Sequence, residues 1–84
     1  MQRPKHGQAQ LAELGDRVRA ARMSRADESG RAMSQERLAE SAGLHRTYIG
    51  HGERGEVNLA LWNLIRIAAA LDIDPGDLVR GLRP

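Results

Sequence analysis

The chain has 84 residues, a net charge of +2 and no cysteine. This length suits one small domain with a modest core, and the missing cysteines exclude disulfides and thiolate ligands while fitting a reducing compartment. The longest apolar run, residues 67–71, is far shorter than the roughly 20 residues of a membrane-spanning helix, so we expect a cytoplasmic protein.

Positive charge is concentrated in the first part of the chain. Residues 1–25 contain six basic and two acidic side chains, which gives a net charge of +4. Such an excess suits a polyanion such as nucleic acid, and it equally suits a solvated basic face. Charge alone leaves both interpretations open.

The N-terminal third is expected to contain an arm, a helix and a loop. Residues 1–7 have Pro, Gly and charges without periodicity, which predicts a flexible arm before a single domain of residues 8–84. The spacing of Leu11, Leu14 and Val18 predicts a helix over 8–22, with the arginines at 17, 19 and 22 mostly on its other faces. Two Ser, one Gly and mixed charge in residues 23–33 predict a long mobile loop.

The middle of the chain has the outline of two short helices joined by a tight turn. Ser34 is a candidate N-cap for a helix over 35–42, and Gly43 follows where a left-handed residue would end that helix. A third helix is predicted over 46–53, burying Ile49. Helix, glycine-containing turn and helix within twenty residues make a helix-turn-helix pattern.

Two more helices are expected in the last third. The most apolar segment predicts a helix over 60–71, and Asp74 and Pro75 then provide the N-cap and first residue of a fifth helix reaching about residue 81 or 82. No segment alternates convincingly between polar and apolar residues. The sequence therefore predicts an all-α domain of five helices.

The fourth predicted helix has a wider apolar surface than one core needs. On a helical wheel one face is formed by Leu61, Leu64, Ile67, Ala68 and Leu71, and Trp62, Ile65 and Ala69 extend it to an arc of roughly 220°. Either the N-terminal arm or a second copy of the chain would cover the extension. We expect the second copy, with a dimer interface of Trp62, Ile65, Val79 and Leu82.

The helix-turn-helix segment resembles a known family, the lambda repressor and Cro-like (XRE) regulators. The resemblance runs from about residue 14 to residue 82, and its matching positions are Ser34-Gln35, Leu38-Ala39, Ala42-Gly43-Leu44, Ile49, Glu53-Arg54-Gly55, Asn58, Leu61, Leu64, Ile67-Ala68 and Leu71. The segments LHRTYIG, ERGE and NL are most similar to the small controller proteins of restriction–modification systems. The resemblance implies a compact five-helix lambda repressor-like fold that binds double-stranded DNA.

In this motif the N-terminal residues of the second helix lie against base edges in the major groove. We therefore expect base contacts from His45, Arg46, Thr47 and His51, and we place Arg46 first because a guanidinium can donate two hydrogen bonds to one guanine.

Contacts to the DNA backbone are expected from Ser34, Gln35, Tyr48 and Arg54. The resemblance implies that Gln35 binds a phosphate at the start of the second helix, where free backbone amides also favour anions. Tyr48 has the alternative of packing against that helix.

The predicted function is that of a sequence-specific transcriptional regulator that binds a near-palindromic operator as a homodimer. Its own promoter or a restriction–modification operon would be the target. An antitoxin that also binds its operator is one alternative, and a protein-binding module on the same scaffold is another.

Other classes of site are not indicated. No cofactor, metal or small-molecule ligand is expected, and neither is an enzyme, because the sequence lacks a glycine-rich phosphate loop and a catalytic His–carboxylate spacing. His45 and His51 are too far apart around a helix to bind one metal ion.

Three glycines near the end of the third predicted helix need an explanation. Gly55 is placed for a left-handed C-cap, but Gly50 and Gly52 each cost about 1 kcal/mol relative to Ala inside a helix. Gly50 is interpreted as allowing a close approach to DNA. Gly52 stands where the family has an apolar residue, so either the helix ends early or Tyr48, Leu59 or Trp62 fills the space. On this basis Gly52→Val is expected to stabilise the fold.

Overall fold

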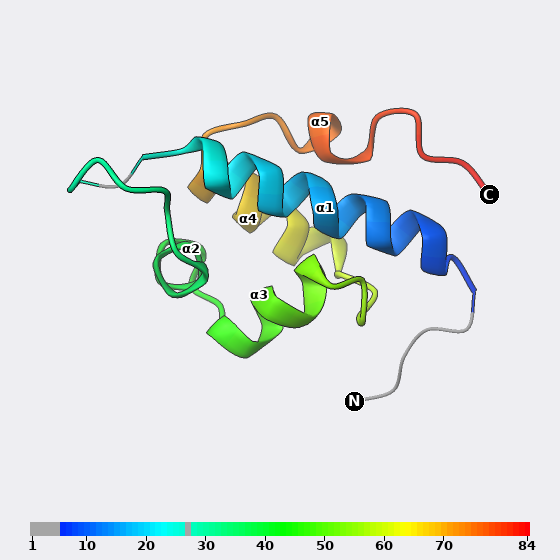
Figure 1. Cartoon of the computed structure of the whole chain (residues 1–84). Coiled ribbons are helices and arrows are strands. Elements are labelled where there is room, and N and C mark those ends of the chain that lie inside the picture. The colour runs from blue at the N-terminus through cyan, green and yellow to red at the C-terminus, as the bar shows by residue number, and fades with distance from the viewer. Residues whose placement is uncertain (1–5, 27) are drawn as a thin grey trace.

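Five helices form the part of the chain that the computed structural model describes, residues 6–26 and 28–84 (Figure 1). They are α1 (Gln8–Ser24), α2 (Gln35–Ala42), α3 (Arg46–Glu53), α4 (Leu61–Leu71) and α5 (Pro75–Val79). The all-α prediction is confirmed, and the predicted bounds of α2 and α3 agree with the structure. Most of the predicted arm, residues 1–5, lies outside the described residues.

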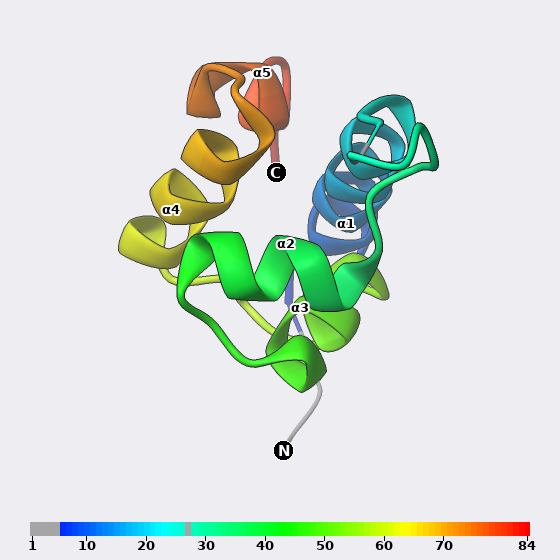
Figure 2. The same cartoon turned by 90° about the vertical axis from the view of Figure 1, so that its left-hand side faces the viewer.

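One small core holds all five helices together. Figure 2 shows α1 and α4 on opposite sides, with α2 and α3 across one end and α5 at the other. Each helix contributes one large side chain that is at most 2% exposed, and these five are Val18, Leu38, Ile49, Ile67 and Leu78. Because the same few side chains link every element, the position of α3 depends on the whole domain.

Local capping chemistry explains where the central helices begin and end. The Ser34 Oγ accepts a hydrogen bond from the Arg37 backbone N–H at 3.0 Å, as expected for an N-cap. Gly43 and Gly55 have the left-handed φ of 71° that ends a helix. At the end of α3, the Glu56 N–H donates to the His51 carbonyl at 2.9 Å, which completes the expected C-cap.

The other helix ends differ slightly from the sequence predictions. α1 continues two residues further, to Ser24, and α4 begins at Leu61 rather than residue 60. α5 ends at Val79, before the predicted 81 or 82, and the Arg17 guanidinium binds the carbonyls of Leu78 and Arg80 at that end, at 3.3 and 2.7 Å. Leu61, which the helical wheel places on the same face as the buried Leu64 and Ile67, is 71% exposed at the first turn of α4.

The two ends of the segment between α1 and α2 are hydrogen-bonded to each other. Ala26 and Ala32 form an isolated antiparallel bridge, and the Met33 N–H donates to the Arg25 carbonyl at 2.8 Å. The Arg25 side chain reaches the end of α4, where Nη1 lies 3.4 Å from the Leu71 carbonyl. The predicted loop is therefore a hairpin-like turn whose base is fastened to α4.

Two glycines set how closely α3 packs, and sequence reasoning missed the first. A Cβ atom on Gly15 of α1 would collide with the backbone carbonyl oxygens of Gly52 and Glu53, so α1 and α3 touch through their backbones here. A Cβ on Gly52 would lie 2.8 Å from Leu59 Cδ2. Of the alternatives for Gly52, α3 does not end early, and Leu59 fills the space.

Candidate nucleic-acid interface

The turn between α2 and α3 is fixed by contacts from α4. The Arg66 Nη2 donates to the Gly43 carbonyl at 2.7 Å, and a Cβ on Gly43 would collide with the same guanidinium. Leu44, the next residue, is half-buried against the core. The left-handed backbone favours glycine at this turn, and a side chain there would also displace the Arg66 guanidinium.

The first residues of α3 present a polar, exposed surface. His45, Arg46 and Thr47 are all exposed, whereas Ile49, less than one turn further along the same helix, is 1% exposed. The short helix is thus anchored through Ile49, while its first turn is open to a partner. Three of the four candidates for base contacts lie together at this exposed N-terminal end of α3.

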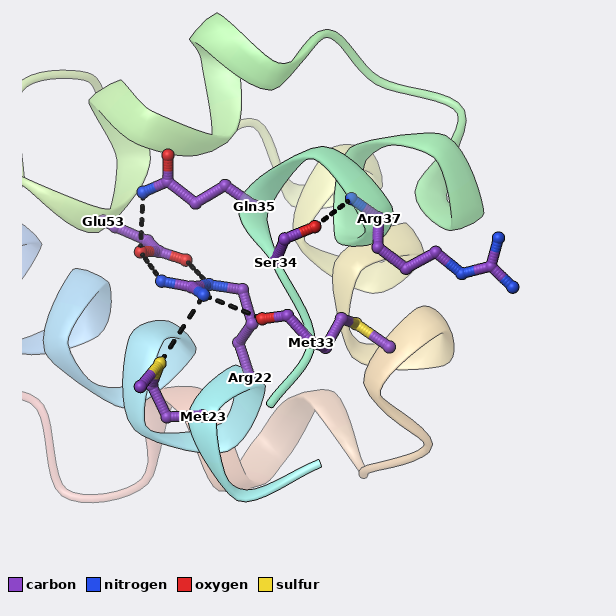
Figure 3. Close-up of polar contacts among 7 residues, drawn as sticks. All are labelled: Arg22, Met23, Met33, Ser34, Gln35, Arg37 and Glu53. Carbon is purple, nitrogen blue, oxygen red and sulfur yellow. Dashed lines mark hydrogen bonds and ion pairs between the residues drawn. The ribbon is translucent and has the colours of Figure 1, made fainter. Parts of the chain in front are cut away.

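The predicted backbone contacts at the start of α2 are already engaged within the protein. The Ser34 Oγ accepts the cap hydrogen bond, which leaves its own hydroxyl hydrogen for a further acceptor. Gln35 is half-buried, and its Nε2 donates to Glu53 Oε1 at 3.0 Å (Figure 3). One N–H of the Gln35 amide remains for a phosphate, and the bond to Glu53 fixes its direction.

Behind Gln35 lies a buried ion pair that sequence reasoning missed. Arg22 Nε and Nη2 donate to the two carboxylate oxygens of Glu53 at 2.7 and 2.9 Å, and Nη1 donates to the Met33 carbonyl at 2.8 Å (Figure 3). Hydrogen bonding to Glu53 raises the pKa of Arg22 against the opposing effect of burial. Arg22 is 7% exposed, so its predicted place on an outer face of α1 is wrong.

A signal for this pair was present in the sequence. Leu14 and Val18 are the buried residues of the core-facing stripe of α1, and Arg22 continues that stripe by one further helical turn. A charged residue in line with buried ones usually has a buried partner of opposite charge. The partner itself, 31 residues further along the chain, has no local signal.

Three polar residues gather at the C-terminal end of α3. Glu56 Oε1 lies 2.7 Å from Arg54 Nε and 2.9 Å from His51 Nδ1. Hydrogen bonds from Arg54 and, second, from His51 lower the pKa of Glu56. His51 lies one turn after Thr47 on the same face of α3, but it is half-buried and held by the Glu56 carboxylate, and its base contact stays a prediction.

Tyr48 connects the candidate recognition helix to α4. Its hydroxyl oxygen accepts from the Ala60 backbone N–H at 3.2 Å and from Asn63 Nδ2 at 3.1 Å. These bonds attach the middle of α3 to the start of α4, a role that neither sequence alternative included. The hydroxyl hydrogen is left to donate, so a phosphate contact by Tyr48 remains a prediction.

Apolar side chains are exposed along the outer side of α4. Trp62 is 65% exposed, Ile65 37% and Val79 of α5 42%, and Leu61 adds to them. Leu82, the fourth predicted interface residue, packs partly against the core of its own chain. Three of the four predicted residues therefore offer apolar surface, with Leu82 half-buried.

We also searched residues 6–26 and 28–84 for a metal site, a membrane-spanning helix and a surface hollow. This part of the chain has no group of three or more His, Cys, Asp or Glu side chains arranged for a metal ion, and none of its helices is long and apolar enough to cross a membrane. An open hollow lies between the start of α1 and the C-terminal tail, lined by His6, Gly7, Gln10, Leu82, Arg83 and Pro84.

Comparison with known proteins agrees with this geometry. Residues 30–78 match the helix-turn-helix family model. The chain is 45% identical over 66 residues to control protein C.BamHI of Bacillus amyloliquefaciens, a match that covers 79% of this chain and 75% of that protein.

Solved structures show the same likeness. The restriction–modification controller protein C.AhdI of Aeromonas hydrophila superposes with a TM-score of 0.73 at 43% identity, covering 83% of this chain and 97% of that one. The P22 c2 repressor, solved in complex with a synthetic operator, superposes with a TM-score of 0.67 at 28% identity, covering 82% and 96%.

Proposed function

This chain belongs to the helix-turn-helix family, and we propose on that premise that it binds a specific double-stranded DNA site and regulates transcription from it. The observation that carries the proposal is the exposed polar start of α3, where His45, Arg46 and Thr47 project from the first turn of a helix that Ile49 anchors in the core. Only an α-helix or a two-stranded ribbon fits the major groove, and α3 offers such a helix. A catalytic role is not part of the proposal.

Sequence reading is assigned chiefly to Arg46. Its guanidinium can donate to O6 and N7 of one guanine, and a good bidentate pair contributes about 1 to 3 kcal/mol of discrimination. Thr47 can meet a thymine methyl or a polar base edge, and His45 a base or a phosphate. His51, held by Glu56, is assigned a supporting contact at the far end of the helix.

Phosphate contacts are assigned to Ser34, Gln35, Tyr48 and Arg54. Each has a hydrogen-bond donor left over from its internal contacts, and Gln35 stands beside the free amides of the first turn of α2. Such contacts fix the register of the protein on the duplex and carry no sequence information themselves.

The binding unit is proposed to be a homodimer. The exposed Trp62, Ile65 and Val79 supply the apolar centre of a two-fold interface, with Leu82 at its edge. A two-fold dimer would place its two recognition helices about 34 Å apart, facing successive major grooves of a near-palindromic operator. Trp62 is the one tryptophan of the chain, so its fluorescence should shift to the blue when dilute protein dimerises.

Titration of the purified protein against the DNA upstream of its own gene tests the proposal. We expect tight binding that weakens steeply with salt and is lost or made unspecific in Arg46→Ala. Arg19→Ala, which removes an exposed arginine from α1, is the matched control and should bind like the wild type. Equal, weak binding to upstream and random DNA would reject sequence-specific recognition, and no salt-dependent binding would favour the protein-binding alternative.

The dimer requires its own test. Trp62→Glu should give a monomer by sedimentation and should weaken operator binding, because each half-site would then bind alone. Undiminished affinity in a monomeric variant would count against the dimer.

A further inference from the structure

The backbone conformation at residue 50 does not require glycine. It lies inside α3 and is not among the described glycines with positive φ, so alanine could adopt the same conformation. Glycine at such a position costs about 1 kcal/mol relative to alanine. The reason for Gly50 must therefore be sought in what stands over it.

The space above Gly50 is occupied by the ends of two polar side chains. A Cβ atom on Gly50 would lie 3.1 Å from Arg54 Nη1, 3.6 Å from Arg54 Nη2 and 3.5 Å from Gln35 Oε1. Side chains on a helix lean toward its N-terminus, so the long side chain of residue 54 naturally covers residue 50, one turn earlier. The Arg54 guanidinium and the Gln35 amide thus meet over a position that has no side chain.

Both side chains are held in place from the protein side. Arg54 Nε donates to Glu56 Oε1 at 2.7 Å and Nη2 lies 3.5 Å from His51 Nδ1, while both Nη groups face Gly50. Gln35 Nε2 donates to Glu53 Oε1 at 3.0 Å. Gln35 therefore turns its acceptor Oε1 toward the space over Gly50, where the Arg54 guanidinium lies, and the N–H of Nε2 that Glu53 does not use is the donor it can offer to a ligand.

We propose that Gly50 is a positioning residue, whose missing side chain lets the Arg54 guanidinium lie beside Gln35 so that the two bind one DNA phosphate. This inference rests on the proposed DNA-binding function and adds a shared site to it. A guanidinium donates two parallel hydrogen bonds to a phosphate, and the Gln35 amide adds a third donor from the neighbouring helix. The site would bridge the two helices of the motif.

Gly50 differs in this respect from the other two glycines near it. The space at Gly52 is filled by the core side chain Leu59, and the space at Gly15 by backbone carbonyls. At Gly50 the nearest atoms are the ends of flexible polar side chains, which can move aside without disturbing the core. A methyl group there should displace Arg54 and leave the fold intact.

The test is the pair Gly50→Ala and Arg54→Ala, alone and together, with melting temperature and operator affinity measured at several salt concentrations. We expect Gly50→Ala to melt at a higher temperature than the wild type and yet to bind the operator about tenfold more weakly. The slope of log affinity against log salt should fall by about 0.9 in each single variant, the value for one phosphate contact. A merely structural role for Gly50 would not change that slope.

The double variant separates this role from a direct approach of Gly50 to DNA. If the added methyl acts by displacing Arg54, the double variant should bind no more weakly than Arg54→Ala alone. If the methyl collides with DNA itself, the two losses multiply, and the proposal is overturned. If Gly50→Ala binds the operator as tightly as the wild type does, the proposal is overturned as well. If the wild-type protein itself does not bind DNA, the proposed function and this inference are overturned together.

Discussion

Arg22 of α1 and Glu53 of α3 are joined inside the protein by two hydrogen bonds of 2.7 and 2.9 Å. The same two side chains also bind the Met33 carbonyl and the Gln35 amide, at the segment that leads into α2 and at its first residue. One buried ion pair therefore connects the long scaffold helix to both helices of the candidate DNA-binding motif. The orientation of α2 and α3 depends on it.

Removing one partner of this pair should be costly. Glu53→Ala would leave the Arg22 guanidinium buried without a counter-charge, and breaking a buried pair in this way costs about 3 to 5 kcal/mol. We expect most of the stability of so small a domain to be lost in urea unfolding. Arg37→Ala, which removes an exposed ion pair with Glu40, should change the free energy of unfolding by less than about 1 kcal/mol. Similar losses in the two variants would contradict the importance of the buried pair.

Replacing both partners separates charge burial from packing. Arg22→Met with Glu53→Leu removes both charges together and keeps apolar volume, so much of the lost stability should return. Because Gln35 would lose its acceptor, this variant should still bind DNA more weakly than the wild type. A double variant less stable than Glu53→Ala would show that the polar network is itself required for folding.

Gly15→Ala tests the close contact between α1 and α3. Helix propensity alone predicts a gain of about 1 kcal/mol. The new Cβ would instead collide with the carbonyl oxygens of Gly52 and Glu53, which are backbone atoms and cannot rotate away. We expect a net loss of about 2 kcal/mol in urea unfolding. An increase in stability would mean that the two helices can separate at little cost.

Features governed by neighbouring residues were predicted well. The Ser34 cap, the left-handed Gly43 and the Asp74–Pro75 start of α5 are local signals, because the cap and the backbone groups it satisfies lie within a few residues. For the same reason the bounds of α2 and α3 agreed with the structure. The five-helix fold and the polar start of α3 could thus be read from the sequence.

Features that depend on contacts between distant segments were missed. Gly15 and Arg22 have their roles only because α1 lies against the end of α3; the stripe on α1 indicates that Arg22 is buried, but no local pattern identifies α3 as the partner. The exposure of Leu61 was missed for a related reason. A helical wheel groups it with the core face, but a wheel does not show how far the neighbouring helices extend, and at the first turn of α4 Leu61 is 71% exposed.

Asp72→Gly should stabilise the end of α4. Asp72 has a left-handed φ of 57°, the one non-glycine residue with positive φ among those described. A left-handed conformation is costly for residues with a Cβ and free of that cost for glycine. The exposed contact of Asp72 with Arg25, at 3.9 Å, contributes little. We expect the free energy of unfolding, measured by thermal unfolding, to rise by about 0.5 to 1 kcal/mol in Asp72→Gly. Asp72→Ala, in contrast, should be less stable than the wild type. A glycine variant no more stable than the wild type would contradict the argument.

For Gly52→Val the structure reverses the expectation from the sequence. The sequence alone predicts stabilisation, since the family has an apolar residue at this position and glycine weakens a helix. In the structure, however, Leu59 already occupies the space, and a Cβ on Gly52 would lie 2.8 Å from its Cδ2. Because Leu59 is only 8% exposed, it has little room to move away from a branched side chain.

We therefore expect Gly52→Val to lower the melting temperature, with a loss of about 1 to 3 kcal/mol typical of an overfilled core. The same substitution in a Leu59→Ala background should be stabilising relative to Leu59→Ala alone, because the valine then fills the cavity that the leucine leaves. This change of sign between the two backgrounds would show that residues 52 and 59 share one space. A higher melting temperature for Gly52→Val in the wild-type background would instead show that Leu59 can move aside, and that α3 tolerates the apolar residue usual in its family.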